Sequence, residues 1–243
     1  MNVNVNEILF HKPDCSYSEK TPGYVNIGTE ERIAVIQSGS AYSRKAMLYC
    51  HGNAEDIHDS TVALQKLGFI PPDVFFAAVA YPGYGLSDGK QSEEGCYRNA
   101  HRLYEWLSVE MGFAPENILV VGYSLGTGVA LELASTCLVR AVLLQAPFLS
   151  GRRLIGFWHP GLEKALPPEV DPFPSLRRIG EVRCPVAVIH GTADEVVPFE
   201  QGEELYAAAP VKAGFTAVAS ARHCNLLATL GAFRYKEIVA GLL

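Results

Sequence analysis

Residues 118–134 read ILVVGYSLGTGVALELA, and this stretch decides the fold. The run at 118–121 is short, apolar and rich in β-branched side chains, which is typical of a buried parallel strand, whereas 129–134 has the composition of a helix. A glycine-flanked turn at 122–126 joins them and has Ser124 at its centre. A serine there lies on a sharp, strained turn, and glycine two positions to either side lets the strand and the helix approach closely. The stretch therefore predicts a nucleophile elbow that exposes Ser124.

The bulk composition limits the class of protein. A chain of 243 residues that is 49% apolar can bury a large core and suits a single α/β domain over residues 1–243. A formal net charge of −6 disfavours nucleic acid, or an anionic membrane surface, as the main partner. The six cysteines are scattered without a close pair, as expected for small core residues in a reducing compartment.

The sequence also lacks the usual signals for export and membrane insertion. No apolar run approaches the roughly 18 residues of a membrane span, and the first residues show no signal-peptide pattern. We therefore expect a cytoplasmic protein that is peripheral to membranes only through its substrate.

Strand-like and helix-like runs alternate through most of the chain. This alternation predicts a mostly parallel, twisted sheet with helices on both faces. The expected strands are 32–37, 46–50, 74–80, 118–121, 140–145, 184–189 and 216–219. The expected helices are 56–67, 92–111, the run after Ser124, 200–209 and 225 onward.

One segment, 148–181, breaks the alternation and is rich in proline and aromatic residues. A stretch of this length inside a compact domain is usually functional. We interpret it as a small cap over the site, with Phe148, Phe157 and Trp158 as candidate contacts for an apolar substrate. The alternative is that these aromatic side chains only pack the segment's own small core.

A serine hydroxyl needs a neighbouring base, and that base needs a carboxylate to orient it. With an elbow serine, the acid and then the base follow in chain order. The acid is expected just beyond a late strand, where open parallel sheets place their ligands. Asp194 fits this position after the strand ending at 189, and we prefer it to Glu195 because aspartate favours turns.

Three histidines downstream of the elbow could supply the base. His190 ends a strand and is expected to point into packing, and His159 lies in the predicted cap, ahead of the acid. His223 follows the last strand through a short loop and precedes the last helix. We therefore predict that His223 is the base.

Acyl transfer also needs hydrogen-bond donors for the developing oxyanion. The backbone N–H of Leu125, directly after the nucleophile, is one expected donor. The other is expected in the loop at 51–56, where Gly52 permits a turn that directs the Asn53 N–H inward, with Ala54 as the fallback. We interpret His51 as a structural residue that ties this loop down.

Other chemistries lack their motifs in this sequence. The elbow glycines are not followed by the Gly-Lys-Ser/Thr of a phosphate-binding loop, and the glycines at 83 and 85 lack the rest of a dinucleotide fingerprint. There is no H-E-x-x-H motif and no Cys/His ligand set. We expect the reaction to need neither a metal nor another cofactor.

With these residues in place, the chain from about 45 to 243 resembles the α/β-hydrolase superfamily of serine hydrolases. More narrowly, it is similar to the group called α/β-hydrolase domain-containing protein 17, which removes palmitate from protein cysteines. The resemblance implies Ser124 as nucleophile, Asp194 as orienting acid and His223 as base. It lies in the residues His51-Gly52-Asn53-Ala54 with Asp56, Tyr84-Gly85, the elbow through Thr127, Phe173-Pro174, Cys184-Pro185, and His190-Gly191-Thr192 through Val196. Ala54 and Tyr84 join the aromatic residues of 148–181 as candidate substrate contacts.

Two features depart from that group. Its members carry a lipidated, cysteine-rich N-terminus, whereas the first cysteine here is Cys15 and no cluster follows. The group's Gly-His-Asn pattern at the base is replaced by Arg222-His223-Cys224-Asn225. Arg222 could lower the pKa of the base, meet a negatively charged substrate group, or simply be solvated.

The sequence therefore predicts a serine hydrolase that cleaves carboxylic esters or thioesters, among them palmitoyl-protein or lipid acyl groups, through an acyl-serine intermediate. Its expected partner is a small-molecule or acylated-protein substrate. The alternatives are a small-molecule carboxylesterase for short acyl chains, a peptidase, or a non-catalytic binding protein that retains the fold.

Overall fold

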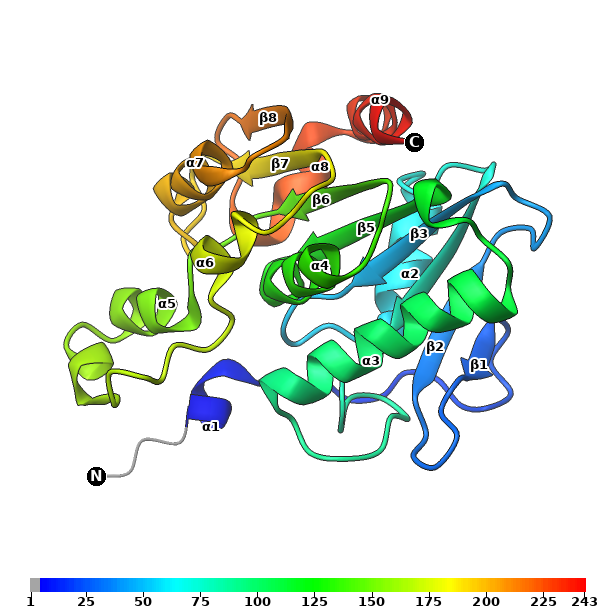
Figure 1. Ribbon diagram of the computed structural model, residues 1–243, viewed down its shortest axis with the longest axis horizontal. Coiled ribbons are helices and arrows are strands. Elements are labelled where there is room, and N and C mark those ends of the chain that lie inside the picture. The colour runs from blue at the N-terminus through cyan, green and yellow to red at the C-terminus, as the bar shows by residue number, and fades with distance from the viewer. Residues whose placement is uncertain (1–4) are drawn as a thin grey trace.

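The computed structural model describes residues 5–243, which form one mixed, mostly parallel sheet covered by helices (Figure 1). The strands lie in the order β1-β2-β4-β3-β5-β6-β7-β8. They are β1 (Tyr24–Asn26), β2 (Ala34–Ser38), β3 (Lys45–Cys50), β4 (Val74–Val79), β5 (Ile118–Tyr123), β6 (Ala141–Gln145), β7 (Val186–Gly191) and β8 (Lys212–Val218). The predicted α/β fold class is confirmed.

The direction of the strands changes at one edge of the sheet. β2 pairs antiparallel with both β1 and β4, and the neighbours from β4 to β8 all pair in parallel. Every residue of β4 and β6 is buried, because helices cover both faces. Parallel strands covered in this way read as continuous apolar runs in the sequence, which is why the run-based prediction found them.

Helices pack on both faces of this sheet. α3 (Glu93–Glu105), α4 (Leu125–Thr136), α6 (Ser175–Ile179) and α7 (Phe199–Ala208) follow one another in contact across the face toward the viewer in Figure 1. The remaining helices are α1 (Val5–Leu9), α2 (Ile57–Lys66), α5 (Gly151–Trp158), α8 (Leu226–Leu230) and α9 (Ala232–Leu242). α3 continues into a π-helical turn at Trp106–Glu110, so the predicted helix 92–111 has two parts.

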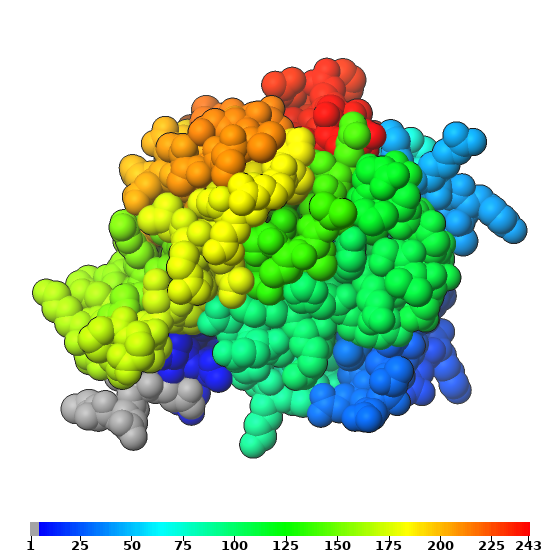
Figure 2. All heavy atoms as spheres, viewed as in Figure 1, coloured from blue at the N-terminus to red at the C-terminus, as the bar shows by residue number. Residues whose placement is uncertain are grey.

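The segment 148–181 contains α5, a 3₁₀ turn at Leu162–Ala165, and α6. Its irregular part is tied together by Arg152, whose guanidinium donates hydrogen bonds to carbonyl groups between 163 and 170. Polar bonds to the backbone thus hold the loop after α5, which explains its weak apolar periodicity. Figure 2 shows α1 lying between this segment and the start of α3. Directly after α1, the ring of Phe10 meets that of Phe173 edge-on, with 6.1 Å between the ring centres.

Within residues 5–243 no helix is both long enough and apolar enough to cross a membrane.

Candidate active site

The turn that carries Ser124 has the backbone geometry of a strained elbow. Ser124 lies between β5 and α4 with φ 51° and ψ −119°, a conformation that non-glycine residues rarely adopt. The flanking glycines permit the close approach. A Cβ on Gly126 would lie 2.0 Å from the carbonyl oxygen of Cys50, and one on Gly122 would lie 2.5 Å from that of Gly126. The elbow therefore requires glycine at both positions.

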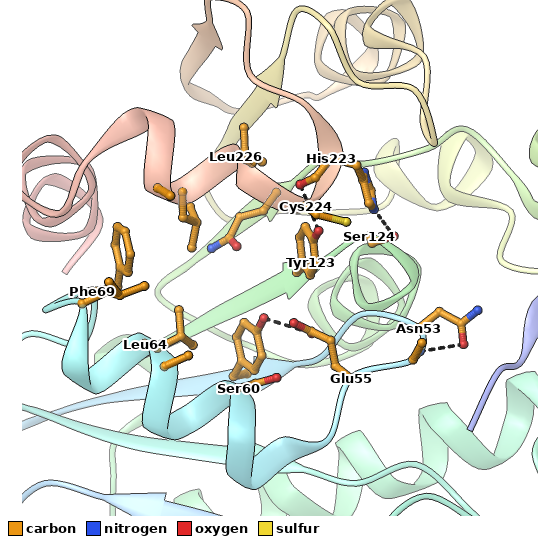
Figure 3. Close-up of a pocket in the computed structure, with 17 residues that line it drawn as sticks. Asn53, Glu55, Ser60, Leu64, Phe69, Tyr123, Ser124, His223, Cys224 and Leu226 are labelled. Carbon is orange, nitrogen blue, oxygen red and sulfur yellow. Dashed lines mark hydrogen bonds between the residues drawn. The ribbon is translucent and has the colours of Figure 1, made fainter. Parts of the chain in front are cut away.

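The structure brings the three predicted triad residues together. Nε2 of His223 lies 2.9 Å from Oγ of Ser124 (Figure 3), and Nδ1 of His223 lies 2.8 Å from Oδ2 of Asp194. Asp194 comes from the turn after β7, and its other carboxylate oxygen accepts hydrogen bonds from the N–H groups of Val196 and Val197. These bonds fix the carboxylate so that Nδ1 of His223 carries the proton and Nε2 faces the serine as an acceptor.

Asp194 is held in its charged form although it is fully buried. Burial alone would raise the pKa of this carboxyl group, but hydrogen bonds from His190 and His223, the charge of His223 and the N–H of Val197 outweigh burial. Together they keep its pKa well below the usual range for aspartate. A permanently ionised acid suits the task of stabilising a histidine that becomes positively charged during a reaction.

The residues next to the triad have supporting positions. His190 is fully buried, as expected, and its Nε2 donates to the carbonyl of Val197 at 3.0 Å and also lies 3.5 Å from Oδ2 of Asp194, so it supports the acid as well as packing in the core. Glu195 faces away from the imidazole ring of His223: it accepts the backbone N–H of that residue at 3.3 Å and pairs with Arg222 at 2.9 Å. The side chain of Arg222 is exposed, which is nearest to the solvated alternative, but it forms an ion pair with Glu195 that was not expected from the sequence.

The backbone N–H groups of Leu125 and Asn53, two residues that line the cavities at Ser124, are among those that have no partner within residues 5–243. These are the two donors that the sequence predicts for the oxyanion. The side chain of Asn53 is turned away, because its Oδ1 accepts hydrogen bonds from the N–H of His11 at 2.8 Å and the hydroxyl of Tyr84 at 2.9 Å. Ala54, the fallback donor, has φ 57°, and its N–H is directed back to the same Oδ1 at 3.1 Å.

His51 holds the start of the loop at 51–56 in place. Its ring stacks on Tyr81 with 4.0 Å between centres, and the hydroxyl of Tyr81 donates to the carbonyl of His51. The ring is fully buried, and desolvation lowers the pKa of His51 to about 4, so that it stays neutral. Its position agrees with the structural role expected from the sequence.

Two cavities meet at the nucleophile, and Asn53, Ser124 and His223 contribute to the walls of both. The larger has a volume of about 400 Å³ and runs between α2 and α8. Figure 3 shows Ser124 and His223 at one end of it and Leu64 and Phe69 at the other. The smaller, of about 180 Å³, is lined on its far side by Leu9, Leu125, Phe148, Leu154, Trp158 and Val196.

The five candidate substrate contacts divide into two groups. Ala54 lines the larger cavity, and Phe148 and Trp158 line the smaller. Tyr84 is 1% exposed, and its hydroxyl donates a hydrogen bond to the side chain of Asn53. It is therefore a positioning residue and does not line either cavity. Phe157 is 47% exposed and lies outside the walls of both cavities, because it is on the outer side of α5. The expectation of substrate contact is wrong for Tyr84 and Phe157 in this structure.

Several residues of the site were not expected from the sequence, among them Leu9, His11 and Glu55. Leu9 and His11 reach it from the N-terminal segment, for which the sequence shows no periodic pattern. Glu55 lies on the wall of the larger cavity, two residues after Asn53 (Figure 3). Its place in the same short loop is the one signal that could have identified it.

One group of side chains has the spacing of a cation site. Oxygen and nitrogen atoms of Asp56, His58 and Asp59 lie within 4.8 Å of one another. Asp56 is already the N-cap of α2, accepting the N–H groups of the other two residues and the hydroxyl of Ser16. The expectation that the reaction needs no metal or cofactor stays a prediction.

Comparison with known proteins gives relatives in sequence and in fold. No protein-family model matches the chain. The chain is 38% identical over 169 residues to α/β-hydrolase domain-containing protein aho-3 of Caenorhabditis elegans and to α/β-hydrolase domain-containing protein 17C of Homo sapiens. Each alignment covers 69% of this chain and 49% of the relative, so the chain spans about half the length of these relatives.

Solved structures with the same fold cover most of the chain. The esterase Pf2001 of Pyrococcus furiosus superposes with a TM-score of 0.69 at 18% identity, covering 96% of both chains. An α/β hydrolase of Vibrio vulnificus superposes with a TM-score of 0.70 at 22% identity, covering 90% of this chain and 80% of its own. These two structures share the fold of the chain. The 38% identity over 169 residues to the two curated relatives shows the class: the chain belongs to the α/β-hydrolase superfamily. Among its curated relatives are the domain-containing protein 17C and aho-3 proteins.

Proposed function

We propose that the protein is a serine hydrolase that cleaves carboxylic esters or thioesters through an acyl-Ser124 intermediate. The observation that carries the proposal is the continuous chain of hydrogen-bond distances from Ser124 through His223 to Asp194. The unpartnered N–H groups of Asn53 and Leu125 beside it supply the second requirement, two donors for an oxyanion.

The reaction follows from this geometry. Oγ of Ser124 attacks the carbonyl carbon while Nε2 of His223 takes its proton, and Asp194 stabilises the imidazolium that results. The N–H groups of Asn53 and Leu125 bind the negatively charged oxygen of the tetrahedral intermediate. His223 then gives the proton to the departing alcohol or thiol, and the acyl group stays on Ser124. Water, deprotonated by His223, releases the acid and restores the serine.

The substrate is inferred to be a small-molecule ester or an acylated protein. The resemblance to the domain-containing protein 17 group favours long-chain acyl groups such as palmitoyl thioesters. A second candidate, a carboxylesterase for short acyl chains, is favoured by the smaller cavity, which is only about 180 Å³ and is bounded by Trp158 and Leu9. The net charge of −6 disfavours nucleic acid as a partner.

Labelling with a fluorophosphonate tests the proposal directly. We expect intact-protein mass spectrometry to show one adduct on the wild type and none on Ser124→Ala. Ser135→Ala is the matched control, because Ser135 lies near the end of α4 and its hydroxyl donates to the carbonyl of Glu132, away from both cavities. Absence of an adduct on the wild type would contradict an activated serine and favour a non-catalytic binding protein.

A chain-length series then separates the two substrate classes. Acyl esters and thioesters from C2 to C16 should be compared by kcat/KM, with Ser124→Ala as background. A rise with chain length would support long-chain acyl substrates, because each buried methylene adds about 0.8 kcal/mol. A maximum at C2–C4 would support the short-chain carboxylesterase.

A further inference from the structure

The two cavities at Ser124 differ in chemistry. Beyond the three residues that it shares with the larger one, the smaller cavity is lined by apolar side chains, and the indole N–H of Trp158 is already donated to the carbonyl of Val196 at 2.9 Å. The larger cavity carries polar groups on its walls, among them Glu55 and Gln145, before it ends in leucine and phenylalanine side chains. A hydrocarbon acyl chain therefore fits the smaller cavity, where it leaves no polar group without a partner.

Glu55 is a carboxyl group on a cavity wall without a cationic partner. Its Oε2 accepts the N–H of Gly52 at 2.6 Å and the hydroxyl of Tyr49 at 3.4 Å, and Ser60 is a further neutral hydrogen-bond partner of the carboxyl group. None of the ion pairs in residues 5–243 includes it. Desolvation raises the pKa of Glu55, while its hydrogen bonds and the nearby charge of His223 act in the opposite direction. An acid in such a place is stabilised by a donor or a positive charge that enters the cavity.

Gln145 provides a second, independent observation in the same cavity. It ends β6, is 1% exposed and lines the cavity wall. Its Nε2 donates to the hydroxyl of Tyr235 at 3.0 Å, whereas its Oε1 has no partner among the described residues. Buried carbonyl oxygens are rarely left in this state, and a donor from a bound ligand would satisfy it.

We propose that the larger cavity binds the leaving group of the substrate, and that this leaving group carries a hydrogen-bond donor, an ammonium or a hydroxyl, which Glu55 accepts. The inference rests on the proposed function. His223, which protonates the leaving group, lines both cavities, but the wall that continues beyond it through Leu226 and Leu227 belongs to the larger cavity alone. Glu55 is thus a specificity-determining residue, and the apolar end at Leu64 and Phe69 takes the rest of the leaving group.

Two pairs of butanoate esters with matched shapes test this. The first pair is the 2-(dimethylamino)ethyl ester, which is protonated at neutral pH, and its hydrocarbon isostere, the 3-methylbutyl ester. The second pair is the 2-hydroxyethyl ester and the propyl ester. Each kcat/KM is divided by the alkaline hydrolysis rate of that ester, so that intrinsic reactivity cancels.

We expect the wild type to prefer the donor-bearing member of at least one pair by about tenfold to a hundredfold, the range of a hydrogen bond to a charged group. A preference in the first pair alone identifies an ammonium, and one in the second pair alone identifies a hydroxyl. Equal rates within both pairs would overturn the proposal. Because this comparison uses the wild type alone, it does not depend on how any variant folds.

Glu55→Gln assigns the preference to its residue. The variant should reduce the ammonium preference at least tenfold, since the amide is uncharged, and keep a hydroxyl preference, since its oxygen still accepts. Glu93→Gln is the matched control, because Glu93 is another part-buried acid with a raised pKa and lies outside the larger cavity. An ammonium preference that survives in Glu55→Gln would overturn the role of Glu55.

The same samples distinguish the two proposals. Ser124 that does not react with the fluorophosphonate contradicts the proposed function itself. Ser124 that reacts, together with equal rates within both ester pairs, contradicts only the assignment of the larger cavity.

Discussion

The hydroxyl of Tyr84 donates a hydrogen bond of 2.9 Å to Oδ1 of Asn53, 31 residues away in the sequence. The same oxygen accepts the backbone N–H of His11, so that two distant segments hold one side chain. With its side chain held outward, Asn53 keeps its own N–H free beside Ser124. The position of a candidate oxyanion donor therefore depends on a buried tyrosine that does not itself line either cavity.

Removing the hydroxyl of Tyr84 should lower the catalytic rate without creating a cavity in the core. Tyr84→Phe keeps the ring and deletes one hydrogen bond, which is worth about 1 kcal/mol, so we expect kcat to fall about three- to tenfold with KM little changed. Tyr104→Phe is the control, because its hydroxyl donates to the carbonyl of Leu138 on the surface. An unchanged kcat in Tyr84→Phe would show that His11 alone is enough to hold Asn53.

The acid of the triad is tested by Asp194→Asn. The amide N–H can donate a hydrogen bond to Nδ1 of His223, which favours the tautomer with a proton on Nε2 and prevents that nitrogen from accepting the proton of Ser124. We expect kcat to fall by about 10⁴ with the fold intact, as in other serine triads. In Glu195→Gln, a change at the next residue in the chain, kcat should fall less than tenfold. A reversed order of the two variants would identify Glu195 as the acid.

The elbow glycines should be intolerant of any side chain. In Gly126→Ala the new methyl group would overlap the carbonyl of Cys50, so we expect the free energy of unfolding to fall by about 3 kcal/mol or more in urea titrations. Gly214→Ala in β8 is the matched control, because no atom lies within 4 Å of a Cβ added there. A Gly126→Ala protein as stable as Gly214→Ala would mean that the turn can widen.

His51 should make stability depend on pH. Burial lowers its pKa to about 4, whereas an unfolded histidine titrates near 6.5. Between these two pH values the unfolded chain binds a proton at His51 and the folded chain does not. The contribution of neutral His51 to the free energy of unfolding is therefore complete above about pH 6.5 and is lost as the pH falls toward 4.

His51→Gln isolates this contribution, since glutamine does not titrate. We expect the free energy of unfolding to fall by about 2 kcal/mol more in the wild type than in the variant between pH 7.5 and 5. The interval from the unfolded pKa of about 6.5 down to pH 5 is roughly 1.5 pH units, and each unit is worth about 1.36 kcal/mol. Urea unfolding followed by circular dichroism at both pH values measures the difference. Parallel losses in the two proteins would show that His51 is protonated in the folded state.

Most of the sheet could be predicted because its strands are covered on both faces. The seven expected runs correspond to β2 through β8, and the bounds of the buried ones agree within about two residues. β8 begins at Lys212, four residues before the expected start, because its first half is largely exposed at the edge of the sheet and has no continuous apolar run. β1 and α1 have three and five residues, too few for a periodic signal, and pairing or packing with the rest of the fold determines them.

In the candidate site, too, features that depend on the order of residues along the chain could be predicted and features that depend on tertiary contacts could not. Ser124, Asp194 and His223 occur in the order that follows an elbow serine, so the sequence alone could identify them. The supports of Asn53 are contacts across 31 and 42 residues between segments without a shared pattern, and only tertiary structure places them. For the same reason the sequence could not tell that Tyr84 is buried while Phe157 faces outward.

The first helix and the residues after it have a practical consequence for protein engineering. Leu9 lines the smaller cavity and the backbone N–H of His11 holds the side chain of Asn53, so the N-terminal segment contributes directly to the candidate site. A shortened version that begins at β1 would keep every strand and still lose one wall of the pocket. Directed-evolution libraries for substrate range should therefore include this segment.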